Sequence, residues 1–283
     1  MFTLIAENKY GQQLELTHND AYVITEIDGL DPPDATINTS KNANADGSVF
    51  NSSYINDRQI IITMAINYPA EENRINLYQY FKTKMPITLY YQNDSRDVYI
   101  QGYVQNMQIG FFDKKQIAQI TILCPKPLFN DVNDNTSKLS QVTDLFEFPF
   151  SIESDSGIEF SSIGNADITI TNDGDVESGF IMTFHALDEV SDPVIYNADT
   201  NEYFGLNVNM SAGDEVTVCT KAKEKSVIYT AADGTTSNAI GNVKEGSTWL
   251  QLIPGVNNFT LTDTGNPGDL YVTFTYTSQY EGV

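Results

Sequence analysis

The chain has 283 residues, and its 38 acidic residues outnumber its 15 lysines and arginines, which gives a formal net charge of −23. This charge argues against a general nucleic-acid-binding protein, which needs a basic face against the phosphates. Hydrophobic residues make up 41% of the sequence. That content argues against wholesale disorder, and the length allows two domains or one large β domain. No run of 18 apolar residues occurs, so no membrane insertion is expected.

Most of the acidic charge lies in the second half of the chain. Residues 1–140 carry a net charge of −5, whereas residues 141–283 carry −18. This change in charge density predicts a domain boundary near residue 140. The polar stretch 131–145 is predicted to be a linker between an N-terminal domain at 1–130 and a C-terminal domain at 146–283.

The first half is predicted to be mainly β. Its Tyr and Phe residues lie among Val, Ile and Thr, which suits a pleated, half-buried surface. Turn signals at Tyr10-Gly11 and Asp28-Gly29 separate the first strands. An apolar run at 60–66 indicates a buried strand. Strands are predicted at 3–7, 13–17, 21–27, 60–66, 87–92, 98–109 and 116–123.

Residues 36–57 are the least compact part of this half. They are rich in Asn, Ser and Asp and show no clear periodicity. A segment of this length and composition predicts a mobile or partner-ordered loop, or a projecting hairpin.

A single helix is predicted between Pro69 and Pro86. Acidic residues occupy its first turn, and Lys82 and Lys84 close it, so both ends complement the helix dipole. Apolar residues recur at spacings of three and four: Ile75, Leu77, Tyr78 and Phe81.

The second half is predicted to be a sandwich or jelly roll of short antiparallel strands. Strand patterns repeat about every ten residues, with Asn-, Asp- and Gly-containing turns between them. The predicted strands are 146–152, 167–171, 179–185, 194–196, 203–208, 215–219, 226–229, 248–252, 258–261 and 270–276.

Residue types that carry catalysis or bind metals are few. The two histidines, His18 and His185, and the two cysteines, Cys124 and Cys219, are isolated from one another and match no catalytic or zinc motif. Residues 131–135 imitate the start of a calcium loop but lack its later glycine and acid. Carboxylate pairs such as Asp155 with Glu159, or Asp188 with Glu189, fit a glycosidase no better than chance. We therefore expect no enzyme, no metal and no cofactor.

The cysteines and the amino end bear on where the protein is made. Two thiols far apart in a long chain predict free, buried cysteines, as in a protein made in the cytosol. The amino end has no basic region before its short apolar run, so no secretory signal is predicted.

Trp249 allows two interpretations. An exposed tryptophan on a sheet of this kind could stack on a sugar ring, which makes Trp249 a possible glycan contact. Alternation along 248–252 places the same side chain in the core instead, and this second interpretation is favoured.

Several passages in a fixed order resemble the distal tail proteins of long-tailed phages, the siphovirus tail component family. They include the turn after residue 27, Arg58 with the strand that follows it, the single helix, and the close of the first half. In the second half they include an Asn-Asp-Gly-Asp turn and a Pro-Gly-Val-Asn strand approach. The passages are 27–33, 46–47, 58–66, 74–81, 99–104, 122–129, 171–175, 200–204, 212–215 and 250–257.

The resemblance implies a mainly β structural virion protein. Its N-terminal domain would be a β-sandwich or barrel with one α-helix that forms a ring, and its C-terminal domain a galectin- or carbohydrate-module-like β-sandwich. Six copies would form a hub ring at the tail tip or baseplate of the virion. The ring would join the tail tube protein to a trimeric tail-associated hub protein and, through the outer domain, to receptor-binding proteins or side fibres. DNA would pass through the lumen without being bound, and the protein would be made in the host cytoplasm.

Within such a ring, the segment 36–57 is the natural element to reach a neighbouring subunit. Phe50, Tyr54 and Ile55 would be its anchors. The alternative for these three residues is that they pack on their own domain. Arg58 would pair with a carboxylate inside one subunit or between two. Closed cyclic symmetry would satisfy the exposed strand edges. The alternatives are an acidic, lectin-like glycan-binding module, and another tube or baseplate-hub component of similar fold.

Overall fold

The computed structural model describes residues 2–41, 44, 46–111, 115–140, 142–144, 161–163, 167–263 and 268–283. The chain divides into two compact units. The first comprises Met1–Val132 together with Gln279–Val283, and the second comprises Asn133–Ser278. The second unit is thus inserted, in sequence, between two parts of the first.

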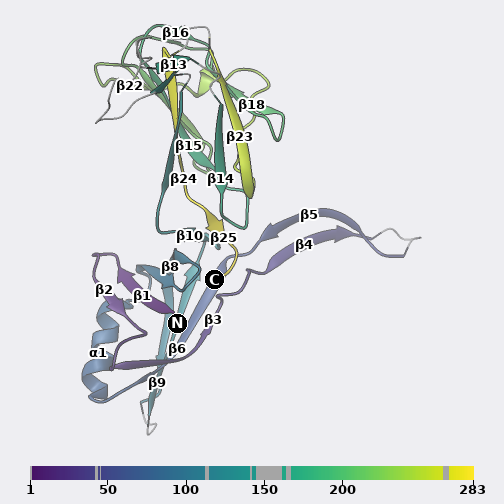
Figure 1. Ribbon diagram of the computed structural model, residues 1–283. Coiled ribbons are helices and arrows are strands. Elements are labelled where there is room, and N and C mark those ends of the chain that lie inside the picture. The colour runs from purple at the N-terminus through teal and green to yellow at the C-terminus, as the bar shows by residue number, and fades with distance from the viewer. Residues whose placement is uncertain are drawn as a thin grey trace, which may run out of the picture. The chain divides into compact units, whose positions relative to one another are not determined.

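The first unit is built on one long antiparallel sheet (Figure 1). Its strands follow the order β2-β1-β7-β8-β9-β6-β3, and β10 pairs with both β8 and β25. The strands are β1 Thr3–Asn8, β2 Gln13–Glu15, β3 Tyr22–Asp28, β6 Arg58–Ile66, β7 Pro86–Gln92, β8 Asp97–Ile109, β9 Gln116–Cys124, β10 Phe129–Asp131 and β25 Gln279–Tyr280.

Alternation of apolar and polar residues explains why these segments form strands with one buried face. In β1 every second residue, beginning with Leu4, is buried. The same period places Ile60, Ile62 and Met64 of β6 in the core of this unit. The predicted strands of the first half are therefore confirmed, because period-2 patterning fixes which face is buried.

The helix α1 spans Ala70–Tyr80 and packs on the core through Leu77, with Phe81 buried just beyond its end. The two lysines expected in its last turn lie outside it, because the chain leaves the helix at Phe81. Ile75 and Tyr78 are exposed. The buried face of the helix is therefore marked by the four-residue spacing from Leu77 to Phe81, and not by the three-residue spacing from Ile75 to Tyr78.

The segment predicted as a loop or a projecting hairpin is a hairpin. Strands β4 (Ala35–Ser40) and β5 (Val49–Ile55) pair only with each other and form a separate two-stranded sheet. We call these two strands the arm. Figure 1 shows the arm extending away from the long sheet of the first unit.

The second unit is a β-sandwich. A six-stranded sheet runs in the order β11-β24-β15-β20-β21-β22, and a four-stranded sheet in the order β14-β23-β17-β18. Phe180 and Phe274 of the first sheet contact Phe259 of the second, with ring centroids 5.8 and 5.3 Å apart. The six-stranded sheet comprises β11 Asn135–Ser140, β15 Phe180–Ala186, β20 Glu215–Cys219, β21 Ser226–Thr230, β22 Thr236–Asn238 and β24 Leu270–Tyr276. The four-stranded sheet comprises β14 Asp167–Asn172, β17 Val194–Asn197, β18 Glu202–Gly205 and β23 Gly255–Thr262.

Smaller elements complete this unit. Two further strand pairs are β12 (Val142–Asp144) with β13 (Ser161–Ile163), and β16 (Val190–Ser191) with β19 (Asn209–Met210). A short 3₁₀ helix, η1, spans Ile240–Asn242. The mainly β fold class expected from the sequence is confirmed, with α1 as the single α-helix of the described residues. No helix in that described part is long and apolar enough to cross a membrane.

The structure differs from the sequence expectation in three places. The stretch 131–145, expected to be a linker, contains β11, whose Leu139 is buried beside Val272 of β24. β11 is an edge strand with a single large apolar residue. Its polar sequence therefore lacks the alternation that would predict a strand. Residues 279–283 belong to the first unit rather than the second. The segment 248–252 forms no strand and makes only one isolated bridge, from Leu252 to Ser178. The strand expected at 146–152 lies outside the described residues.

Candidate assembly surface

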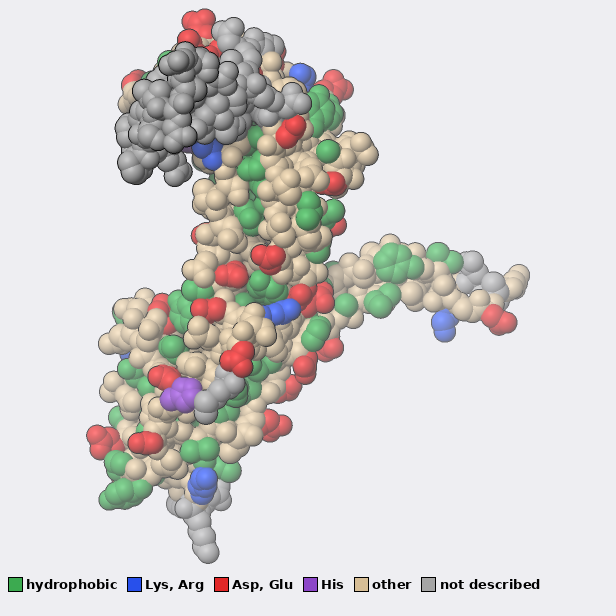
Figure 2. Space-filling view, viewed as in Figure 1, with side chains coloured by type: hydrophobic (Ala, Val, Ile, Leu, Met, Phe, Trp, Pro, Cys, Tyr) green, Lys and Arg blue, Asp and Glu red, His purple; other side chains and the backbone are tan. Residues whose placement is uncertain are grey.

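The arm has one apolar face. Its register pairs Ala35 with Ile55 and Thr39 with Phe50. Because side chains alternate along β4, these four residues and Ile37 point to the same side. We call Ala35, Ile37, Phe50 and Ile55 the apolar face of the arm. Ile37, Phe50 and Ile55 are 65%, 62% and 39% exposed, and Figure 2 shows hydrophobic side chains open to solvent along the arm.

The opposite face of the arm is mainly polar, with Thr36, Asn38, Ser40 and Ser52, but it also carries Val49, which pairs with Ser40 and is 53% exposed. Tyr54 lies there, paired with Thr36 and 57% exposed. Three side-chain hydrogen bonds follow this face: Thr36 Oγ1 to Asn56 Oδ1 at 3.0 Å, Asn38 Nδ2 to Ser52 Oγ at 3.1 Å, and Ser40 Oγ to Asn51 Oδ1 at 3.3 Å. The arm is therefore amphipathic, and its polar side is internally hydrogen-bonded.

An isolated two-stranded hairpin is at best marginally stable in water. The arm adds no apolar side chain to the core of the first unit. Its apolar face would therefore gain stability from a surface that covers it. Of the residues predicted as anchors, the structure places Phe50 and Ile55 on this face and Tyr54 on the other. Ile37 was missed, although its alternation with Ala35 is visible in the sequence.

Arg58, the fourth predicted interface residue, is 3% exposed and lies at the start of β6. Its guanidinium donates to four backbone carbonyls: Pro127 at 2.6 Å, Gly29 at 2.6 Å, Asp31 at 2.7 Å and Glu281 at 2.5 Å. The guanidinium also lies over the ring of Phe129, 4.6 Å from its centroid. Burial lowers the pKa of this guanidinium. Backbone carbonyl oxygens, rather than a carboxylate, accept these four hydrogen bonds.

Trp249 is half-buried rather than an open platform. It packs against the core of the second unit and lies 5.3 Å from Phe204, ring to ring. The ammonium of Lys225 lies over its ring at 5.4 Å. The favoured interpretation, that Trp249 packs inward, agrees with this environment, although it lies outside a regular strand.

The residue types considered for chemistry are held in local networks. The Nδ1 atom of His185 contacts a carboxylate oxygen of Glu215 at 2.9 Å, and its Nε2 atom contacts the hydroxyl of Thr273 at 3.1 Å. Cys124 is buried, and burial raises the pKa of its thiol to about 12. Within the residues that the structure describes, no group of three or more His, Cys, Asp or Glu side chains could hold a metal ion.

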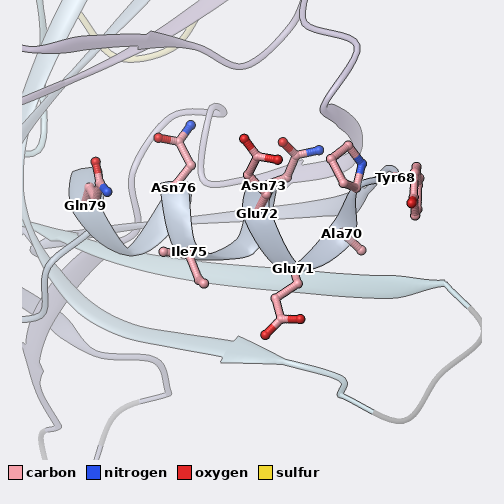
Figure 3. Close-up of a pocket in the computed structure, with 9 residues that line it drawn as sticks. Tyr68, Ala70, Glu71, Glu72, Asn73, Ile75, Asn76 and Gln79 are labelled. Atoms are coloured by element: carbon pink, nitrogen blue, oxygen red, sulfur yellow. The ribbon is translucent and has the colours of Figure 1, made fainter.

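An open groove of about 880 Å³ runs along α1 (Figure 3). Its carboxylates do not converge: Glu71 and Glu72 point to opposite sides of the helix. The most exposed ring beside it, Tyr68, is 94% exposed at the start of α1. The groove is therefore an open surface depression without converging polar side chains, unlike a catalytic cleft.

A mainly β, two-unit chain with an uncovered amphipathic arm is an assembly protein by its fold and surface. Two family models match the sequence: the phage tail protein RIFT-related domain at residues 9–124, and the siphovirus-type tail component, C-terminal domain, at residues 173–280. Together they cover most of the chain. The protein belongs to the family of siphovirus-type tail components, the distal tail proteins of long-tailed phages.

One solved structure shares the fold of this chain, and two others match it at lower TM-scores. The crystal structure of the Dit protein of phage SPP1, described as a paradigm of the hub adsorption apparatus of phages that infect Gram-positive bacteria, matches with a TM-score of 0.65. It is 15% identical, and 99% of each chain is covered. Two structures of the baseplate of phage P2 in its activated conformation, with Ca and with Sr, match over 100% of each chain at 12% and 11% identity. Their TM-scores are 0.48 and 0.47. The comparison with curated proteins finds no match.

The resemblance inferred from the sequence is thus confirmed, and the protein is a distal tail or baseplate hub component of a phage virion.

Proposed function

We propose that six copies of this protein form the hub ring at the tip of the tail. The first unit makes the ring, and the second unit projects from it. The ring joins the tail tube protein on one side to a trimeric tail-associated hub protein on the other. Receptor-binding proteins or side fibres attach to the second unit, and DNA passes through the lumen without being bound.

The observation that carries this proposal is the amphipathic arm. Ile37, Phe50 and Ile55 are exposed on one face of the arm and belong to no core of the described chain. A second copy placed by rotation would cover each arm in turn, and rotational closure limits the assembly to a ring rather than a filament. In this arrangement Phe50 and Ile55 are interface residues. Arg58 belongs to the interface only through the position it gives to the arm.

The proposed role is structural, without catalysis and without a cofactor. The net charge of −23 on the whole chain supports a protein that repels DNA rather than one that retains it. Synthesis in the host cytoplasm fits the two free cysteines.

The test is the mass of the purified protein in solution, measured by light scattering over a concentration series, alone and with the tail tube protein. Six copies of the 31.5-kDa chain weigh about 190 kDa. A species of that mass that is ring-shaped by negative-stain electron microscopy is expected in at least one condition. A strict monomer in both conditions would contradict the ring.

A further inference from the structure

The root of the arm is formed by two segments that Arg58 holds together. β4 begins four residues after Asp31, and β5 ends three residues before Arg58. One Nη atom of Arg58 donates to the carbonyls of both Gly29 and Asp31. The amide of Asn56 donates to the carbonyl of Asp34 at 2.9 Å and closes the base of the hairpin. Arg58 therefore connects the entrance of the arm with its exit.

Gly29 is required for this arrangement. Its φ is +88°, and a Cβ atom there would lie 2.1 Å from the carbonyl oxygen of Gln59. Only glycine takes this conformation and allows this close approach without strain. The Gly29 carbonyl is thereby turned toward the guanidinium.

The other side of Arg58 is completed by residues that follow the second unit. The C-terminal segment, residues 279–283, returns to the first unit, where Tyr280 pairs with Phe129. Glu281 supplies the carbonyl that accepts from the second Nη atom of Arg58. The amide of Val283 donates to the carbonyl of Leu30 at 3.2 Å. The segment therefore contacts the root of the arm both directly and through Arg58.

A second arginine holds the same segment. Arg96 donates to the carbonyl of Gly282, and its guanidinium lies 4.4 Å from the ring centroid of Tyr280. A Cβ atom on Gly282 would lie 3.1 Å from the Leu30 carbonyl and 3.2 Å from Pro32. The segment is thus closely packed on residues 30–32, from which the arm departs.

We propose that the C-terminal segment and Arg58 together set the direction of the arm, and so make the first unit competent to join a neighbouring copy. The inference rests on the proposed role of the arm in the ring. Arg58 acts as a positioning residue, and its planar fork of donors can join four carbonyls that a lysine ammonium could not. The arm is correctly placed only when residues 279–283, which follow the second unit in the sequence, are bound to the first unit.

The test measures arm direction without assembly. Nitroxide labels are placed on the arm and on β8 (Ser52→Cys and Gln101→Cys) in a Cys219→Ser background. The labelled chain itself carries Phe50→Ser, so that it stays unassembled, and it is diluted with unlabelled Phe50→Ser protein. Distances are measured by double electron–electron resonance in the parent, in Arg58→Lys and in a chain lacking residues 281–283. Arg74→Lys, in which the same change is made on α1, is the matched control. Thermal melts report whether each variant folds.

The parent and Arg74→Lys should give one narrow distance distribution. Arg58→Lys and the deletion should broaden it with a cooperative melt retained, and in unlabelled protein they should raise the concentration needed for ring formation at least tenfold. A narrow distribution in both folded variants, or a broad one in the parent, would overturn the proposal. Loss of folding in both variants would also overturn it, in favour of a purely structural role. A different outcome would refute the proposed role of the arm in the ring. In that outcome the distance distributions are narrow in the parent and broad in the two variants, as expected, but Phe50→Ser leaves assembly unaffected.

Discussion

Replacing Phe50 by serine should weaken ring assembly much more than replacing Tyr54 by serine. Both are aromatic residues of β5 with similar exposure, 62% and 57%. They lie on opposite faces of the arm, because Phe50 pairs with Thr39 and Tyr54 with Thr36. The pair therefore separates the effect of the apolar face from the effect of losing any large side chain.

The expected magnitude follows from the area left to be covered. An aromatic side chain buries about 200 Å² when covered, so the exposed part of Phe50 offers about 120 Å². At about 25 cal/mol per Å² this is about 3 kcal/mol for each interface. Since 1.4 kcal/mol is tenfold in an equilibrium constant, each contact should weaken about 100-fold.

The assay is sedimentation velocity over a concentration series, in the condition where the parent forms rings. The midpoint of assembly should rise about 100-fold for Phe50→Ser and less than about threefold for Tyr54→Ser. Thermal melts should be unchanged in both, because neither side chain belongs to a core. Equal effects, or a larger effect of Tyr54→Ser, would refute the assignment of the two faces.

Two predictions concern the stability of the separate units. Gly102→Ala should destabilise the first unit by about 1–3 kcal/mol in denaturant unfolding, because a Cβ atom there would lie 2.6–2.8 Å from three atoms of β9. Gly241→Ala, where nothing lies within 4 Å, is the control and should change stability by less than about 0.5 kcal/mol; equal effects would contradict the packing argument. In the second unit, the Tyr229 hydroxyl donates to the carboxylate of Asp214, which lowers the pKa of Asp214, while burial and that carboxylate raise the pKa of Tyr229 to about 12. The stability from Asp214 should be present above about pH 4 and lost at lower pH. The stability from Tyr229 should be present below about pH 10 and lost as the pH rises towards 12. Asp214→Asn should reduce the acid-side dependence of stability in thermal melts, and an unchanged pH profile would contradict it.

Local patterns predicted most of the strands and the helix. Alternation along β1 and β6, and the turn residues between strands of the second half, act within a few residues of each other, so the sequence reveals them directly. Where the alternation is short or weak, as in β11 with its single buried Leu139, the local sequence predicts a linker instead of a strand. The order of family passages along the chain was likewise visible without any structure.

By itself, the sequence determined the β content, the single helix, the acidic second half and the family. Only the tertiary structure decided which arm residues share a face, because that depends on the register between β4 and β5 and on the irregularity after Asn38. Only the tertiary structure brought Gly29, Pro127 and Glu281 to one guanidinium, since Arg58 and Glu281 are separated by 223 positions. Contacts at such separations leave no local pattern in the sequence. The residues next to each partner determine only whether it lies in a strand or a turn, and the packing of the whole unit brings the partners together.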